Sequence, residues 1–370
     1  MDVVPVESPA DLRRFIQVPY DRYRGHPYWV APLPSDELVR LTPGKNPYFE
    51  HAEAAYFLAR DGGKVVGRVS ASVDRNYDSF QGEKQATFGF FEAASADATA
   101  ALIAAAESWA RSKGADVLRG PMSFTTNDEC GLLIEGFDRR PVLLMPYNPP
   151  EYAAWITAAG LAKAKDLYSF RCPVPQVLPP AYARIASRAR MQEGLTTRPL
   201  DMRRFDEELA HVKVIYNSAW EKNWGFVPMT DREIDHMAAQ LKPVVKADLI
   251  RFAEIDGRVV AFALCVPDAN IALQKVGGRL FPFGIFKLLW ALPRVREFRV
   301  MALGLGPGLR RKGIGPLLIA EMAGITKRLG YTSCDIGWIL EDNETVHDMS
   351  QVMGGVRSSV YRIYERRLGR

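Results

Sequence analysis

The chain is poor in the residues that build metal and disulfide sites. Its four cysteines, Cys130, Cys172, Cys265 and Cys334, are dispersed and form no C-x-x-C pair. Neither structural zinc nor a disulfide framework is therefore expected. The five histidines show no metal-ligand spacing. A reducing cytoplasm is the expected compartment, and no metal is predicted as a cofactor.

Long apolar runs and a strong charge bias are also missing. No apolar run reaches the roughly 18 residues that a bilayer-spanning helix needs, and residues 1–7 lack the charged and apolar regions of a signal peptide. The net charge of +5 suits a protein that binds small anions, but it is too small to indicate nucleic acid as a partner. The length of 370 residues favours two domains.

The second half of the chain repeats the order of the first. Residues 202–205 (Met-Arg-Arg-Phe) echo residues 12–15 (Leu-Arg-Arg-Phe), and residues 256–260 (Asp-Gly-Arg-Val-Val) echo residues 62–66 (Gly-Gly-Lys-Val-Val). A repeat this long indicates a duplicated domain. Strands and helices alternate after an opening hairpin, which indicates α/β layers in each copy.

A stiff connector separates the two copies. Residues 173–180 are rich in proline, and a short helix is predicted over residues 181–191. We therefore predict a first domain over residues 1–172, a connector with a short helix over residues 173–194, and a second domain over residues 195–370.

A basic, glycine-rich segment follows a predicted strand in the second copy and precedes a predicted helix. Residues 310–315 read Arg-Arg-Lys-Gly-Ile-Gly, after the apolar run at residues 300–306. Gly313 and Gly315 let backbone amides approach a ligand without hindrance from a Cβ atom. Unpaired amides at a helix N-terminus, beside three cations, form a cradle for a diphosphate. A strand-to-helix turn can also be basic and glycine-rich without binding anything.

The spacing Arg-x-x-Gly-x-Gly resembles the acetyl-CoA signature of the GNAT acyltransferase superfamily. As in that pattern, the next predicted strand, residues 331–339, is followed by Asn343, which opens a helix that closes at residues 354–355. The whole chain resembles a tandem GNAT protein of a little-characterised bacterial group. This resemblance implies an α/β fold of two tandem domains, each a mixed, mostly antiparallel sheet flanked by helices.

The resemblance also implies a function. We expect a CoA-dependent N-acyltransferase that uses acetyl-CoA or a longer acyl-CoA on a small-molecule or lipid-like amine. The implied cofactor-binding residues are Leu303, Leu305, Arg310, Arg311, Lys312, Gly313, Ile314, Gly315 and Asn343. Three alternatives stay open: an inactive acyl-CoA-binding or scaffold protein; a Fem-type aminoacyl-tRNA-dependent transferase, whose group lacks a CoA loop; and a structural partner protein.

The first copy lacks the CoA loop. Residues 95–100, which correspond to the glycine loop, contain no glycine and no cation, and Asp97 would repel a diphosphate. The first domain is thus predicted to be a degenerate copy that binds no CoA. It carries an insertion near residues 120–137, which is either a substrate-recognition loop bearing Asn127, Asp128 and Glu129 or a simple connector.

The residues for proton transfer are ambiguous. Acyl transfer to an amine needs a base for the ammonium proton and an acid for the leaving thiolate. Many GNAT enzymes place a tyrosine eight residues into the helix that starts at the asparagine, where this chain has Ser350. The candidates are Ser350, Tyr361 and Tyr364 for the acid, and Asp335 and Glu341 for the base.

Two apolar segments are candidates for binding the acceptor or the acyl chain. The loop at residues 216–228 is rich in aromatic and amide side chains that either line the acceptor pocket or belong to the core. These side chains are Asn217, Trp220, Asn223, Trp224 and Phe226. The most apolar window, residues 280–292, indicates a buried or dimer-forming helix, a wall for a long acyl chain, or a helix lying on an anionic membrane.

Overall fold

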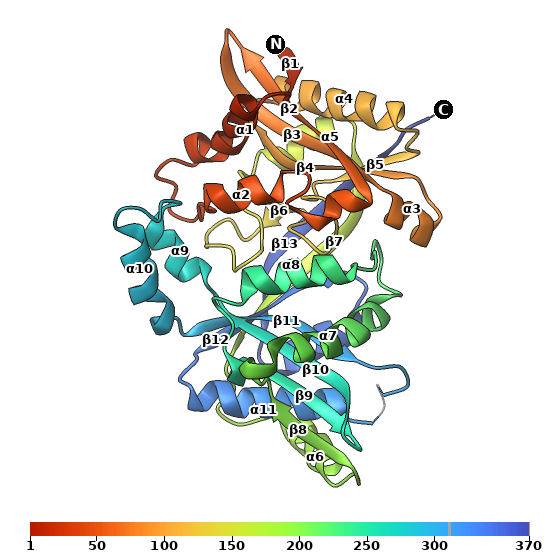
Figure 1. The fold of residues 1–370 in the computed structure, drawn as a ribbon, viewed down its shortest axis with the longest axis vertical. Helices are drawn as coiled ribbons and strands as arrows, with labels where there is room; N and C mark the ends of the chain where they lie inside the picture. The colour runs from red at the N-terminus through yellow and green to blue at the C-terminus, as the bar shows by residue number, and fades with distance from the viewer. Residues whose placement is uncertain (310–311, 370) are drawn as a thin grey trace.

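A computed structural model describes residues 1–309 and 312–369 (Figure 1). A single large sheet runs through the molecule in the order β1-β2-β3-β4-β5-β13-β7-β12-β11-β10-β9-β8, with β6 paired to β13. Neighbouring strands are antiparallel except for the pairs β4–β5 and β11–β12, which are parallel. The predicted mixed, mostly antiparallel α/β fold is confirmed.

The elements follow one another in two similar series. The first comprises β1 (Asp2–Pro5), α1 (Pro9–Arg22), α2 (Pro34–Arg40), η1 (Pro47–Glu50), β2 (Ala52–Asp61), β3 (Lys64–Asp74), α3 (Arg75–Gln81), β4 (Gln85–Ala93), α4 (Ala96–Ser112), β5 (Val117–Gly120), β6 (Leu132–Glu135), α5 (Tyr152–Ala158) and β7 (Ala162–Pro173). After α6 (Pro180–Arg190), the second comprises β8 (Leu195–Pro199), η2 (Met202–Arg204), α7 (Phe205–Trp220), α8 (Asp231–Leu241), η3 (Ala247–Leu249), β9 (Ile250–Ile255), β10 (Arg258–Pro267), α9 (Asn270–Val276), α10 (Gly284–Ala291), η4 (Leu292–Arg294), β11 (Glu297–Leu305), α11 (Ile314–Arg328), β12 (Ser333–Leu340), α12 (Glu344–Val352) and β13 (Val356–Arg367). In both series, four antiparallel strands lead through a long helix to a parallel fifth strand.

The last strand of each series lies beside strands of the other. β7, which ends the first series, pairs with β12 and β13 of the second. β13 in turn reaches into the first series and pairs with β5 and β6 (Figure 1). The domain boundaries at residues 172 and 195 stay a prediction, because the two halves share the centre of one sheet.

Helices cover both faces of the second half's sheet. On one face α7 buries Ile215 against Phe252 and Phe262, and on the other α11 buries Leu318 against Ala261. The connector helix α6 packs on the outside of α11. Among residues 1–309 and 312–369, no helix is both long enough and apolar enough to cross a bilayer.

Candidate active site

Strands β11 and β12 separate in the middle of the second half. Their ladder ends at the pair Val300–Ile336. The β10–β11 register shifts at that point, between Leu264 and Cys265, and leaves Met301 as a bulge. A bulge bends a strand and ends its pairing. Among the described residues, no ladder pair joins the two strands beyond it, so β11 presents an open backbone edge.

This edge, which we call the β11 edge, consists of Met301–Leu305. Five residues of strand span about 17 Å, a length that suits an extended pantetheine arm. Amides of a ligand can pair with such an edge as an added strand would. Leu303 and Leu305 turn their side chains towards α11, where an added Cβ atom at Gly315 would lie 3.7–3.8 Å from them.

The start of α11 lies at the end of the β11 edge. Gly313 caps the helix with φ 75°, a left-handed conformation that favours glycine. The first backbone hydrogen bond of the helix runs from the Leu317 amide to the Gly313 carbonyl, at 3.0 Å. The amides of Ile314 and Gly315 precede it and therefore have no acceptor within the helix. Lys312 beside them is exposed. These groups suit a diphosphate.

Two members of the predicted CoA loop, Arg310 and Arg311, lie outside the described residues. The residues that follow, Lys312 and Gly313, contact α6 and the turn after it. Gln192 donates to the Lys312 carbonyl at 2.6 Å, and an added Cβ atom at Gly313 would meet Ile185 at 3.0 Å. Replacing Gly313 would therefore disturb the fold as well as any ligand, and Gly315 is the better position to test.

The first half has a matching separation of strands. The β4–β5 ladder ends at Thr87–Arg119, and the β3–β4 register shifts just beyond it. The helix that follows, α4, is already capped, because the Ser95 hydroxyl accepts from the Ala98 amide at 3.2 Å. Asp97 adds negative charge to its first turn. No cradle for an anion exists here among these residues.

The chain itself occupies the strand edge of β4. The Met122 amide donates to the Phe88 carbonyl at 2.7 Å. The Tyr152 hydroxyl accepts from the Ala93 amide at 2.9 Å. An added Cβ atom at Gly89 would lie 1.9 Å from the Met122 carbonyl oxygen, which shows how closely the inserted backbone approaches. The two halves therefore differ at equivalent places: β4 is covered and β11 is open.

A buried polar group lies where β11 and β12 separate. Asp335, opposite Arg299 in the ladder, accepts from the Ser169 hydroxyl at 2.5 Å. Burial raises the pKa of Asp335 to about 6, against the lowering effects of the Ser169 bond and the Arg299 charge. Burial, and then the Asp335 charge, raises the pKa of Tyr361. At neutral pH the carboxyl group of Asp335 is therefore ionised and the phenol of Tyr361 is protonated.

Two other candidates for proton transfer, Ser350 and Glu341, and the predicted cofactor-binding residue Asn343 have structural partners. Ser350 is fully buried, and its hydroxyl donates to the Val346 carbonyl at 2.7 Å. Asn343 caps α12 by accepting from the Val346 amide at 3.3 Å. Glu341 lies 2.6 Å from Lys163. Tyr364 belongs to the hydrophobic cluster of the first half, whereas Tyr361 lies close enough to Asp335 to feel its charge. Asp335 and Tyr361 are thus the candidates that lie together.

The predicted acceptor residues do not form one lining. Asn217 uses both sides of its amide to hold Met229, at 3.0 and 3.1 Å. Trp220 stacks on Tyr216 with ring centroids 4.8 Å apart. The Asn223 backbone makes a turn with Trp220. These three residues of the predicted set shape the loop.

Trp224 and Phe226 lie in different places. Phe226 is buried and meets the ring of Phe80 edge-on. Trp224 lies between two cations, 5.7 Å from the Arg119 guanidinium and 5.8 Å from the Lys165 ammonium. It also packs against the hydrophobic cluster that contains Tyr361. Of the five predicted residues, we retain Trp224 as a candidate for binding the acceptor.

The insertion of the first half contacts the aromatic loop of the second. Thr126 donates to the Gly225 carbonyl at 2.9 Å, and Asn127 donates to the Val227 carbonyl at 3.1 Å. The Tyr216 hydroxyl donates to Asn127 at 3.0 Å. The insertion thus fixes the loop that carries Trp224.

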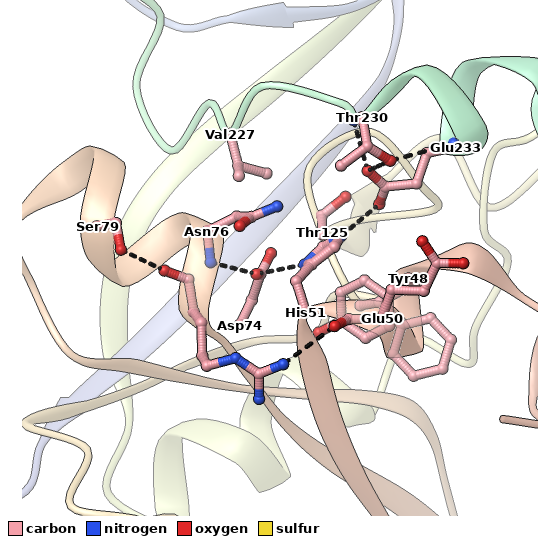
Figure 2. Close-up of polar contacts among 12 residues, drawn as sticks. Tyr48, Glu50, His51, Asp74, Asn76, Ser79, Thr125, Val227, Thr230 and Glu233 are labelled. Carbon is pink, nitrogen blue, oxygen red and sulfur yellow. Dashed lines mark hydrogen bonds and ion pairs between the residues drawn. The ribbon is translucent and has the colours of Figure 1, made fainter. Parts of the chain in front are cut away.

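A titratable cluster that the sequence analysis did not single out joins the halves (Figure 2). His51 Nδ1 lies 2.7 Å from Asp74 Oδ1. Its Nε2 lies 3.2 Å from Glu233 Oε1, which belongs to α8 of the second half. Although burial lowers the pKa of His51, the hydrogen bond to Asp74 and the Glu233 carboxylate beside Nε2 raise it to about 9. At neutral pH the imidazolium therefore bridges two carboxylates.

This cluster borders a small polar cavity of about 10 Å³. That volume holds about one water molecule and is too small for a substrate. The residues around it are Tyr48, Ser72, Asp74, Tyr77, Gln85, Thr87, Met122, Phe124, Thr125, Thr126 and Gly225. Within the described residues, no group of His, Cys, Asp and Glu side chains is placed to hold a metal ion. The cluster is thus a strap between the halves rather than a second site.

Two curated proteins match nearly the whole chain. It is 35% identical over 376 residues to the bacterial ceramide synthase of Caulobacter vibrioides (strain NA1000 / CB15N), a match that covers 100% of this chain and 98% of that protein. It is 36% identical over 366 residues to Protein YghO of Escherichia coli (strain K12), which covers 97% of this chain and 93% of that protein. The chain belongs to the family of these two proteins. No protein-family profile matches it.

Solved structures of similar fold support the predicted resemblance. A tandem GNAT protein from the clavulanic acid biosynthesis pathway aligns over 100% of this chain and 99% of its own, with a TM-score of 0.59 at 14% identity. A GCN5-related N-acetyltransferase from Sphaerobacter thermophilus aligns over 100% and 96%, with a TM-score of 0.51 at 14% identity. At this identity the likeness shows the fold alone, and that fold is the tandem GNAT fold.

Proposed function

We propose that this protein is an acyl-CoA-dependent N-acyltransferase that forms an amide on a lipid-like amine, with acyl-CoA bound by the second half. The observation that carries the proposal is the open β11 edge, which ends at the amides of α11. The matching edge in the first half is covered by the chain itself. We therefore expect one acyl-CoA per chain.

The direction of β11 orients the ligand. A diphosphate on the amides of Ile314 and Gly315 places the pantetheine arm along the β11 edge from Leu305 back towards Met301. The thioester then lies near the bulge, one ladder pair from Asp335. The chemical step thus falls at the buried polar group described above.

The relative from Caulobacter vibrioides favours a class of acceptor. It is named a bacterial ceramide synthase, and a ceramide is the amide of a fatty acid and a long-chain amino alcohol. We infer the same acceptor class for this chain, a primary amine on a long hydrocarbon chain. Trp224, among apolar side chains near Tyr361, would contact the apolar body of the acceptor.

In the proposed reaction, the amine nitrogen attacks the thioester carbonyl and the carbon–sulfur bond breaks. Asp335 accepts the proton that the attacking nitrogen loses. Tyr361 donates a proton to the leaving thiolate, and the products are the amide and free CoA. Proton transfer by a positioned acid and base contributes about 10²- to 10⁴-fold in rate.

The test is a turnover assay with acyl-CoA chains of increasing length, from acetyl to stearoyl, and a long-chain amino alcohol. Free thiol is measured with a chromogenic disulfide, and the amide is identified by mass spectrometry. We expect thiol release that depends on the amine and matches the amide formed. Acyl-CoA binding with neither thiol nor amide would overturn the proposal in favour of an inactive acyl-CoA-binding protein.

A further inference from the structure

The surface of α10 and the turn before it carries apolar side chains that no other part of the described chain covers. Five large side chains are between 56% and 82% exposed: Phe281, Phe283, Phe286, Leu289 and Trp290. We call this set the α10 face. Its exposure shows that residues 280–292 do not form a buried helix. A contiguous apolar patch on a protein surface commonly marks a site of interaction.

The α10 face points away from the body of the molecule. The hairpin of α9 and α10 lies at the molecule's edge (Figure 1), and an added Cβ atom at Gly278, between the two helices, would meet Pro32 and Ala31 at 3.0 and 3.1 Å. Its inner helix, α9, is fixed to the first half: Gln274 donates to the Pro27 carbonyl at 2.6 Å, and Asn270 donates to the Pro141 carbonyl at 3.0 Å. α10 packs on α9, so its outer face is held outward by a rigid support.

The segment that carries this face is rich in cations and has no acidic residue. Between Asp268 and Glu297 the sequence contains no aspartate or glutamate. The same stretch holds the exposed cations Lys275, Arg279, Lys287, Arg294 and Arg296. Two of them flank the Trp290 ring, with the Arg294 guanidinium 4.2 Å and the Lys275 ammonium 5.2 Å from its centroid. The charge therefore complements an anionic surface.

The apolar side chains and the flanking cations together indicate what binds the α10 face. A helix with aromatic and aliphatic side chains on one face and cations at its margins is typical of helices that lie in the interface of an anionic membrane. A second copy of this chain would bring the same cations face to face across a two-fold axis, which like-charge repulsion disfavours. An anionic bilayer satisfies both the apolar and the charged groups.

We propose that the α10 face docks this protein on the surface of an anionic lipid bilayer. Phe281, Phe283 and Phe286 enter the boundary between headgroups and acyl chains, and the flanking cations contact lipid phosphates. The proposal rests on α9 and α10 and not on the proposed acyl transfer. It would hold for a protein that only binds acyl-CoA.

The experiment is co-sedimentation of the full chain with vesicles of phosphatidylcholine alone and of phosphatidylcholine mixed with phosphatidylglycerol. We expect binding to the anionic vesicles that weakens with added salt and is at least tenfold weaker on phosphatidylcholine alone. The variant Phe283→Ser/Phe286→Ser should lose at least tenfold in binding to the anionic vesicles. Its matched control is Val177→Ser/Val214→Ser, two exposed valines elsewhere, which should bind as the wild type does.

A second variant and a second measurement keep the test decisive. Arg279→Glu/Lys287→Glu leaves the apolar side chains in place and should also lose binding to the anionic vesicles. Sedimentation velocity without lipid should give the same size for the wild type and the Phe283→Ser/Phe286→Ser variant. The proposal is overturned by wild-type binding in both face variants, by no binding in the wild type, or by a wild-type oligomer that the phenylalanine substitutions dissociate.

Discussion

At the scale of single residues, the proposed acyl transfer depends on Asp335. Its carboxylate is buried between strands, and burial keeps its pKa near 6 although the Ser169 bond and the Arg299 charge act against the shift. Such a group is ionised at neutral pH and is still basic enough to accept a proton. It is also one ladder pair from the point where β11 and β12 separate.

We predict that kcat/KM rises with pH through about 6 and levels off above pH 7, because only the ionised carboxylate accepts a proton. Asp335→Asn should lower kcat by about 10²- to 10⁴-fold and remove this rise, with acyl-CoA binding retained. Ser350→Ala is the control and should keep most of the activity, since its hydroxyl bonds only within α12. An Asn variant with an unchanged pH profile would exclude Asp335 as the base.

At the scale of elements, His51 helps to tie α8 to the first half, beside the ion pair of Arg232 with Glu50. His51 lies between Asp74 of β3 and Glu233 of α8, and Glu233 also completes the capping box of α8 with Thr230. Because the folded-state pKa of His51, about 9, lies above the ordinary histidine pKa of 6.5, the charged form stabilises the folded state.

The stability from this strap should be fully present below about pH 6.5 and lost as pH rises through about 9. We expect a loss of the order of 1–2 kcal/mol after solvent screening. Chemical denaturation of the wild type and of His51→Gln between pH 6 and pH 10 measures it. The free energy of unfolding of the wild type should exceed that of the variant at pH 6, and this difference should disappear by pH 10. If the difference in free energy of unfolding did not change with pH, the charged form of His51 would not be the source of the stability.

The sequence predicted those elements that local pattern determines. The hairpin at β2–β3, the helix α4, the strand β11 and the helix α11 all depend on spacing within a short stretch. His51, Asp74 and Glu233 were missed because their contacts join positions far apart in the chain. The Thr-x-x-Glu pattern at Thr230 was visible, but it indicates only where a helix begins.

The acceptor residues show the same limit. Asn217, Trp220 and Phe226 have the composition of a binding pocket, yet tertiary contacts use them to fix a loop and fill the core. Residues 280–292 contain the apolar window of a buried helix, but the structure exposes its outer face. Composition alone did not distinguish a buried core from an exposed apolar surface.

At the scale of the whole molecule, the two halves share one sheet. β7 and β13 pair along nine ladder positions from Val356–Arg171 to Glu365–Ala162. Across this pairing Arg362 binds Asp166 at 2.7 and 2.9 Å. Each half therefore depends on the other for its central strand neighbours.

We predict one cooperative unfolding transition for the full chain in scanning calorimetry. If one half unfolded alone, it would expose the edge of the central strands of the other half, because β7 and β13 pair across the two halves. Arg362→Ala should lower the midpoint by about 1–3 °C for a chain of this size and leave a single transition. Two separate transitions in the wild type would contradict the shared sheet.

The central claim is that one acyl-CoA binds in the second half, on the β11 edge and the start of α11. Calorimetric titration with CoA tests it most directly, with Gly315→Val, Lys312→Gln and, at the far end of α11, Arg328→Gln as the control. We predict one CoA site per chain in the wild type. Binding should be lost in Gly315→Val, the affinity should fall about two- to fivefold in Lys312→Gln, and the affinity should be unchanged in Arg328→Gln. Two sites per chain, or full affinity in a folded Gly315→Val variant, would contradict it.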